Sequence, residues 1–264
     1  MIFDFHTHIS PGDDVAKLIE AMDQNGVDKS GACVVVAPGG DSGQTANKLL
    51  HQAVTKYPDR LVGYAGVIPY ADDGAEFLRY CVDTYGFRAL KLHPSIQQFY
   101  PDDRRIFAVV EEAIKLDIPI LIHTGTVPIP GTASKYDNPI HIDDLALVYP
   151  EAKIVMAHAD PFGETPAIAA KHPNVYMDTT TTFARYARLI PGLAEETLRF
   201  MSLCQAESDT AFGCGKTLFG SDANAAKGFR IAENLAPLQQ LNLPEEEKAM
   251  ILGGNALKLL KLEI

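Results

Sequence analysis

Short apolar runs rich in β-branched residues alternate with longer amphipathic stretches along the whole chain. The amphipathic stretches, for example Asp14–Gln24 and Thr45–Tyr57, predict helices. Apolar strands separated by helices are typical of parallel β-α units, in which helices cover both faces of the sheet. The apolar runs predict eight strands, at Ile2–Phe5, Ala32–Val36, Leu61–Ile68, Arg88–Leu92, Pro119–Ile122, Lys153–Ala157, Asn174–Met177 and Thr217–Phe219.

Eight strands in 264 residues match the size of a closed (β/α)8 barrel, the TIM barrel. The alternative is a doubly wound open sheet, which normally carries a glycine-rich phosphate-binding loop after its first strand. Here the first strand is followed by HTHISPGDD, which contains no such loop. The sequence therefore predicts one α/β domain over residues 1–264, a TIM barrel closed by a helix that Asn255 caps.

The composition narrows the range of partners. A formal net charge of −11 argues against nucleic acid and anionic membranes, because both require a positive face. The chain shows no signal peptide and no apolar run of the ~18 residues that a membrane helix needs. The four cysteines lie far apart without a C-x-x-C pair, which is typical of reduced thiols. We expect a cytoplasmic protein that acts on a small molecule.

Chemically reactive side chains gather at the ends of the predicted strands. Because strand ends of a barrel meet at its carboxyl-terminal mouth, these side chains should face one small space. Crowded imidazoles and a carboxylate would lose their solvation there unless a cation compensated them. Zinc suits such ligands best, and manganese, iron or cobalt would also fit. The residues are His6, His8, His93, His123, His158 and Asp222.

The order of these residues resembles that of the amidohydrolase superfamily. The segments FDFHTH, KLHP, LIHTG, MAHAD, LFGSDA and GNALKLL are similar to its amidohydrolase-2 branch, and the likeness spans nearly the whole chain. That branch contains metal-dependent TIM-barrel hydrolases and the aminocarboxymuconate-semialdehyde and γ-resorcylate decarboxylases. A phosphoesterase is a weaker alternative, because KLHP stands where TatD-like nucleases carry a glutamate.

The resemblance implies a role for each residue. His6, His8, His123 and Asp222 would bind one metal ion, and His158 would act beside it as an acid, a base or an orienting group. His93 would contact the substrate. Asp178 could orient a ligand or form an ordinary hydrogen bond, and Asp4 could orient one of the first two histidines. In the competing binuclear arrangement, a carboxylated Lys91 bridges two ions, and His123 and His158 bind the second.

A metal ion with an open position lowers the pKa of bound water from ~16 to ~7, which generates hydroxide at neutral pH. Asp222 and His158 could then move the proton, so both are predicted to be catalytic. Hydrolysis of a small carbonyl compound such as a lactone or amide is the leading prediction. Non-oxidative decarboxylation of an aromatic or enoic acid is the alternative. A metal-bound protein without catalysis is a third reading.

Recognition of the substrate must come from the loops around the mouth. Tyr136 lies in the long stretch Thr124–Ile140, which is either a lid or a solvated connection. Arg185 follows the seventh strand and could bind an anionic group. The resemblance also implies that two chains could pair as a homodimer.

Overall fold

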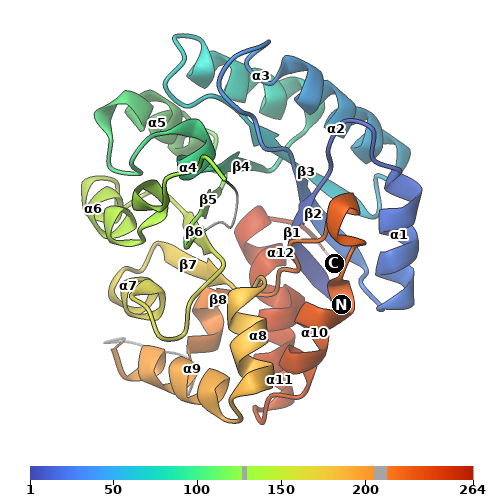
Figure 1. Cartoon of the computed structure of the whole chain (residues 1–264), viewed down its shortest axis with the longest axis vertical. Helices are drawn as coiled ribbons and strands as arrows, with labels where there is room; N and C mark the ends of the chain where they lie inside the picture. Colours follow the sequence, from blue (N-terminus) through green and yellow to red (C-terminus); the bar gives the residue numbers. More distant parts are fainter. Residues whose placement is uncertain (127–129, 205–212, 264) are drawn as a thin grey trace.

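The computed structural model describes residues 1–126, 130–204 and 213–263. Eight parallel strands pair in chain order and confirm the predicted TIM barrel. In Figure 1 the strands form an inner ring and helices lie outside it. The strands are β1 Phe3–His8, β2 Lys29–Cys33, β3 Leu61–Gly66, β4 Ala89–Leu92, β5 Ile120–His123, β6 Ile154–Ala157, β7 Val175–Asp178 and β8 Thr217–Leu218.

Helices connect each strand to the next. The principal α-helices are α1 Val15–Gln24, α2 Gln44–Lys56, α3 Gly74–Tyr85, α4 Pro94–Gln97, α5 Phe107–Lys115, α6 Ile140–Val148, α7 Thr165–Lys171, α8 Thr182–Leu189, α9 Leu193–Cys204, α10 Ile231–Gln239, α11 Glu245–Ala249 and α12 Asn255–Leu260. Short 3-10 turns cover Arg104–Ile106, Ser134–Asp137, Gly213–Lys216 and Ala225–Lys227, and a π-helical turn covers Met250–Gly254. None of the described helices has the length and apolar character needed to span a bilayer.

The barrel closes where β1 meets the segment after β8. Phe5 N donates to Phe219 O, and Asp222 N donates to His6 O, each at 2.8 Å. His8 N donates to Ala223 O at the same distance. The seam therefore joins the start of the chain to residues near its end.

A register shift in β1 governs where its side chains point. Asp4 pairs with Ser30, but the next pairing is Thr7 with Ala32, so β1 carries an extra residue. Strict alternation is lost at this point. Phe5 consequently joins the inner core, where its ring lies 5.4 Å from that of Tyr64, and the imidazoles that follow still reach the mouth.

Two layers of apolar side chains hold the barrel. The inner layer fills the barrel with residues such as Phe3, Leu121 and Val155, and α12 adds Leu257 and Leu260 to it. The larger outer layer packs the strands against the helices. Asn255 is the first residue of α12, and its amide donates to carbonyl oxygens of Cys214 and Thr217 instead of capping the helix. The predicted cap is therefore wrong, because the preceding π-helical turn runs directly into α12.

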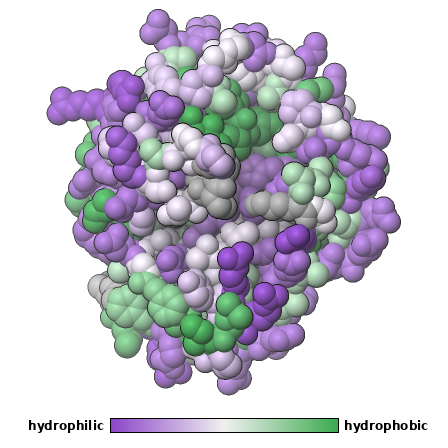
Figure 2. Space-filling view, viewed as in Figure 1, coloured by the Kyte–Doolittle hydropathy of each residue, from purple (hydrophilic) through white to green (hydrophobic). Residues whose placement is uncertain are grey.

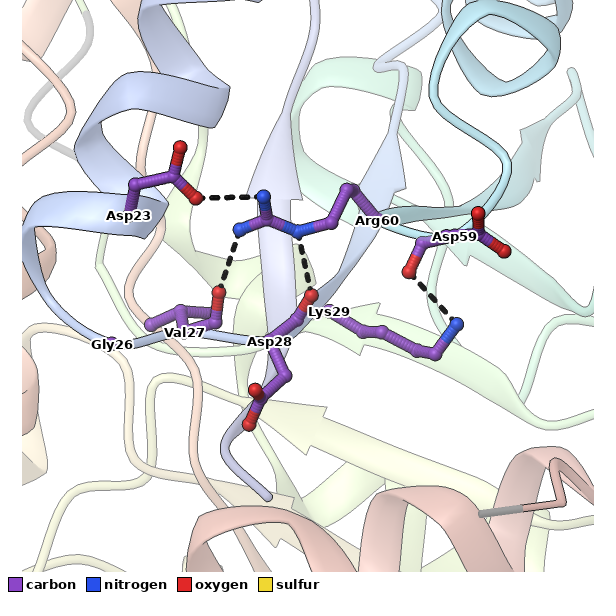
Figure 3. Close-up of a pocket in the computed structure, with 7 residues that line it drawn as sticks. All are labelled: Asp23, Gly26, Val27, Asp28, Lys29, Asp59 and Arg60. Atoms are coloured by element: carbon purple, nitrogen blue, oxygen red, sulfur yellow. Dashed lines mark hydrogen bonds and ion pairs between the residues drawn. The ribbon is translucent and has the colours of Figure 1, made fainter.

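The surface offers two features outside the mouth. Figure 2 shows apolar side chains over α8 and α9, where Leu189, Phe200 and Leu203 are exposed. A cleft of about 460 Å³ lies near the amino ends of β2 and β3 (Figure 3). Arg60 spans it, bound to Asp23 and to two backbone carbonyl oxygens. The hydrogen-bonding groups of the cleft pair with one another, so Arg60 links α1 and the loop after it to the segment before β3.

Candidate metal centre

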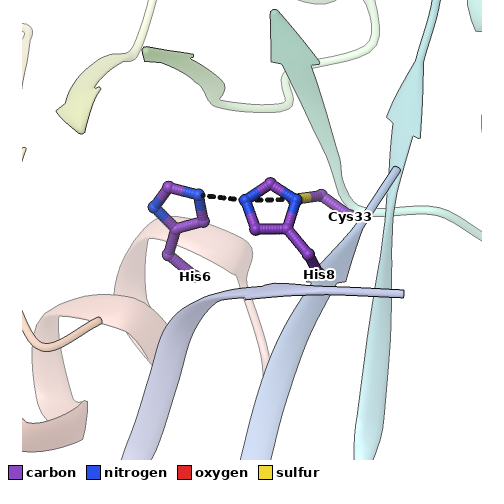
Figure 4. Close-up of side chains that lie close together, drawn as sticks. All are labelled: His6, His8 and Cys33. Atoms are coloured by element: carbon purple, nitrogen blue, oxygen red, sulfur yellow. Dashed lines mark hydrogen bonds between the residues drawn. The ribbon is translucent and has the colours of Figure 1, made fainter. Parts of the chain in front are cut away.

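Three side chains from the two ends of the chain meet at the mouth. His6 Nε2 lies 3.0 Å from His8 Nε2, and His8 Nε2 lies 3.1 Å from Asp222 Oδ1. The distance from His6 Nε2 to Asp222 Oδ1 is 3.9 Å. Figure 4 shows the two imidazoles side by side. The backbone bond from Asp222 to His6 at the barrel seam is what brings the carboxylate to the histidine pair.

A buried carboxylate sets the tautomer of His6. His6 Nδ1 lies 2.8 Å from Asp178 Oδ2 on β7. Burial would raise the pKa of Asp178, but the charge and hydrogen bond of His6 outweigh it and lower that pKa to about 2. Because the ionised carboxylate accepts a hydrogen bond from Nδ1–H, the lone pair of Nε2 faces the cluster. This is the arrangement of a metal-binding histidine.

His123 and His93 form a stacked pair above this cluster. Their ring centroids are 4.0 Å apart and their planes differ by 9°. The stacking fixes the ring of His123 against that of His93. His123 Nε2 is buried and has no hydrogen-bond partner among the described residues. This nitrogen is an unsatisfied ligand atom that a cation would complete.

His158 lies beside both parts of the site. Its ring centroid is 4.6 Å from that of His123 and 5.3 Å from that of His6. His158 Nδ1 lies 2.8 Å from the Thr180 hydroxyl, which itself donates to Asp178 at 2.5 Å. The hydroxyl therefore accepts the Nδ1 proton, and Nε2 retains its lone pair. Burial lowers the pKa of His158 to about 3, so the ring is neutral.

Two of these residues have a left-handed backbone. The φ angles of His158 and Asp222 are 61° and 55°. Such conformations are costly for residues other than glycine and concentrate at functional sites. Both residues are the ones predicted to carry protons. His158 directly follows β6, whereas Asp222 lies four residues beyond the end of β8.

Cys33 and Lys91 complete the surroundings of the histidine pair. Cys33 Sγ lies 3.3 Å from His8 Nδ1. Burial lowers the pKa of Lys91, which is 2% exposed. Its amino group lies 2.9 Å from His6 Nε2, so a hydrogen-bonding amino group stands beside a predicted ligand atom.

Asp137 enters the mouth from the loop after β5. It is 1% exposed, and its Oδ1 accepts the Ser95 backbone N–H at 3.0 Å. Its Oδ2 is buried without a partner among the described residues. Asp137 belongs with His93 and His123 to one group of candidate metal ligands. Burial raises the pKa of this carboxyl to about 6. Asp137 lies in a polar loop, where the sequence gives no sign that one carboxylate is buried at the mouth.

The other expected roles have mixed outcomes. Asp4 bonds to Ser221 and to the backbone N–H of His6, not to an imidazole, because the register shift breaks the alternation that the prediction used. Tyr136 is half-buried and its ring packs 4.8 Å from Tyr100. Arg185 is exposed on α8. Contact of Tyr136, Arg185 or His93 with a substrate stays a prediction.

The four predicted metal ligands do not all lie equally close together. His6, His8 and Asp222 meet within 3.0 to 3.9 Å, and His158 shares a group with His6 and Asp222. His123 reaches this group through its contact with His158. Imidazole nitrogens together with a carboxylate whose pKa is held well below its usual range fit a divalent ion. Sequence reasoning missed Cys33, because an isolated cysteine gives no spacing signal.

A closed barrel with histidines and an aspartate at its mouth defines the amidohydrolase-superfamily class of enzyme folds. The family model described as amidohydrolase matches residues 3–262, so the chain belongs to this family. No curated protein matches the sequence.

Several solved structures share the barrel. A 5-carboxyvanillate decarboxylase from Sphingomonas paucimobilis is 16% identical with a TM-score of 0.74, and the match covers 99% of each chain. A 2,6-dihydroxybenzoate decarboxylase complexed with 2,6-dihydroxybenzoate is 17% identical with the same TM-score and coverage. A 5-carboxyvanillate decarboxylase from Novosphingobium aromaticivorans, complexed with manganese and 4-hydroxy-3-methoxy-5-nitrobenzoic acid, is 16% identical with a TM-score of 0.74, covering 99% of this chain and 96% of that one. At such identities the likeness shows the fold.

Proposed function

We propose that the protein is a metal-dependent decarboxylase that releases carbon dioxide from a small aromatic or enoic carboxylic acid without oxidation. The convergence of His6, His8 and Asp222 within 3.9 Å, beside a neutral His158, carries the proposal. The likeness to decarboxylases supports this reaction over hydrolysis, which the sequence favoured. Hydrolysis of a lactone or amide is the second candidate, because the same donor set serves it.

The ion would be held by His6, His8, His123 and Asp222. Zinc suits this set, and manganese is supported by the ion bound in one of the similar structures. When bound, the ion supplies positive charge that orients an anionic substrate and stabilises charge developing on its oxygens. A binuclear arrangement with carboxylated Lys91 stays the less favoured alternative.

The chain's own residues would orient the substrate and handle the proton. Decarboxylation leaves an electron pair on carbon, and a proton must take the place of the lost carboxylate. His158 Nε2 has a free lone pair, and His158 and Asp222 offer atoms within 4.8 Å of each other. Neither group carries this proton at rest, so His158 Nε2 would take it up from water, with the Asp222 carboxylate stabilising the imidazolium, and would deliver it to carbon. His93 and Arg185 would position the substrate, and Tyr136 would line the entrance.

A substrate screen with metal analysis tests the proposal. Protein purified without chelator should contain about one divalent ion per chain. Aromatic and enoic carboxylic acids should then yield carbon dioxide, whereas lactones and amides should not react. Asp222→Asn should retain the fold and lower turnover by about 10² to 10⁴-fold. Hydrolysis of lactones without carbon dioxide release would replace the proposal by the second candidate, and full activity of the variant would remove Asp222 from the chemistry.

The remaining expectations accompany this proposal. A small organic acid is the expected partner, and the cytoplasm the expected location. A homodimer is proposed from the family resemblance and would be checked by measuring the mass of the protein in solution.

A further inference from the structure

The two histidines of β1 differ in what holds their second ring nitrogen. A histidine that binds a metal through Nε2 usually donates its Nδ1 proton to a neighbouring acceptor, which fixes the ring. For His6 this acceptor is the Asp178 carboxylate at 2.8 Å. For His8 the group in the same place is the Cys33 thiol, 3.3 Å from Nδ1 (Figure 4).

The position of the thiol is itself fixed. Cys33 is the last residue of β2, and its side chain is fully buried in the inner core. Its Sγ lies 3.1 Å from the carbonyl oxygen of Thr7, which can only accept a hydrogen bond. The S–H group therefore donates to Thr7, and a sulfur lone pair is left to accept the Nδ1 proton of His8.

This arrangement holds His8 from both sides. Sulfur contacts Nδ1, and on the other side Nε2 lies 3.1 Å from Asp222 and 3.0 Å from His6 Nε2. With the proton on Nδ1, the lone pair of Nε2 points at the atoms that would share the ion. Sulfur is nearer to Nδ1 than to Nε2, which lies 4.0 Å away. The geometry thus suits an orienting group better than a fourth ligand.

We propose that Cys33 is a positioning residue of the metal centre, which fixes the ring of His8 and selects the tautomer that binds the ion. The inference rests on the metal site of the proposed function but not on the reaction, so ion binding alone can test it. It predicts that an acceptor is required at position 33, and that the thiol itself does not bind the ion.

The experiment compares substitutions that keep or remove the acceptor. Cys33→Ser retains a hydroxyl that can accept from Nδ1, whereas Cys33→Ala does not. Cys33→Val also lacks an acceptor but fills more of the space, and it replaces the alanine variant if that one unfolds. Cys81→Ala is the matched control, because Cys81 is a buried thiol in α3, outside the barrel. Thermal unfolding of each metal-free variant establishes that the fold is intact.

The readouts are the dissociation constants of Mn²⁺ and Co²⁺ and the absorption spectrum of the cobalt form. Loss of an acceptor of this kind typically weakens metal binding 10- to 100-fold, so we expect that loss for Cys33→Ala and an altered cobalt spectrum. Cys33→Ser and Cys81→Ala should bind both ions nearly as the unchanged protein does.

Each outcome bears on the proposal. Unchanged affinity and spectrum in Cys33→Ala would overturn the inference and leave the proposed function standing. A thiolate-to-cobalt band that disappears in Cys33→Ser would also overturn it, by showing that Cys33 is a ligand. Failure of the unchanged protein to bind Mn²⁺ or Co²⁺ would overturn both the inference and the proposed function.

Discussion

Lys91→Met should strengthen metal binding. The Lys91 amino group lies 2.9 Å from His6 Nε2, within hydrogen-bond distance. Because His6 Nδ1 donates to Asp178, Nε2 has one lone pair, which can accept from the lysine or bind an ion but not both. An ion that enters the site must therefore displace the amino group. Methionine has a similar length and no donor, so it removes this competition.

The size of the effect follows from the single contact that is lost. His6 is the one hydrogen-bond partner of the Lys91 amino group among the described residues. A typical hydrogen bond contributes about 1 kcal/mol net, which corresponds to about fivefold in a dissociation constant. We therefore expect Mn²⁺ to bind about fivefold more tightly to the variant.

Calorimetric titration of metal-free protein with Mn²⁺ gives both the affinity and the number of ions. Lys216→Met is the control, because that lysine bonds to backbone carbonyl oxygens at the opposite end of the strands, including those of His172 and Val175. Equal or weaker binding by Lys91→Met would refute the competition. A fall from two ions to one would instead support the carboxylated-lysine arrangement.

Three further outcomes are expected. Removal of the metal by a chelator should abolish turnover and lower the unfolding temperature, and Zn²⁺ or Mn²⁺ should restore both; unchanged melting and activity would speak against a bound ion. The pKa of Asp178 is lowered to about 2 from its ordinary value of 3.8, so the stabilisation by this carboxylate is present above pH ~4 and is lost as the pH falls toward 2. Urea unfolding of the metal-free protein at several pH values should show this loss, and Asp178→Asn should lack it. Arg185→Ala and Tyr136→Phe should raise KM with little change in kcat, and an unchanged KM would exclude these side chains from substrate binding.

The sequence predicted the barrel because its signal is local. Each strand of the barrel is a short apolar run, and seven predicted ranges overlap the observed ones closely. The exception is β2, which begins at Lys29, three residues earlier than predicted, because Lys29 and Ser30 are polar although they pair with neighbouring strands. The nearness of His6 and Asp222 follows from parallel strand ends that meet at one mouth. Side-chain positions that depend on contacts between distant residues leave no comparable local pattern in the sequence.

Three residues show where sequence reasoning ended. Asp4 was placed by strict alternation, which the register shift of β1 interrupts. Asp137 reaches the mouth only because a turn of the long loop folds inward and Ser95 holds it there. Cys33 acquires its role from the strand beside it, since the partner atoms belong to Thr7 and His8. Each outcome depends on a neighbour distant in the chain.

The seam of the barrel joins residues that lie far apart along the chain. His6 and His8 stand near the amino terminus, and Asp222 follows the eighth strand. An ion shared by these three side chains would link both sides of the seam, so part of its binding free energy would oppose opening of the barrel there. The three side chains come together only when the segment after β8 has paired with β1, so binding of the ion would report that the ring has closed.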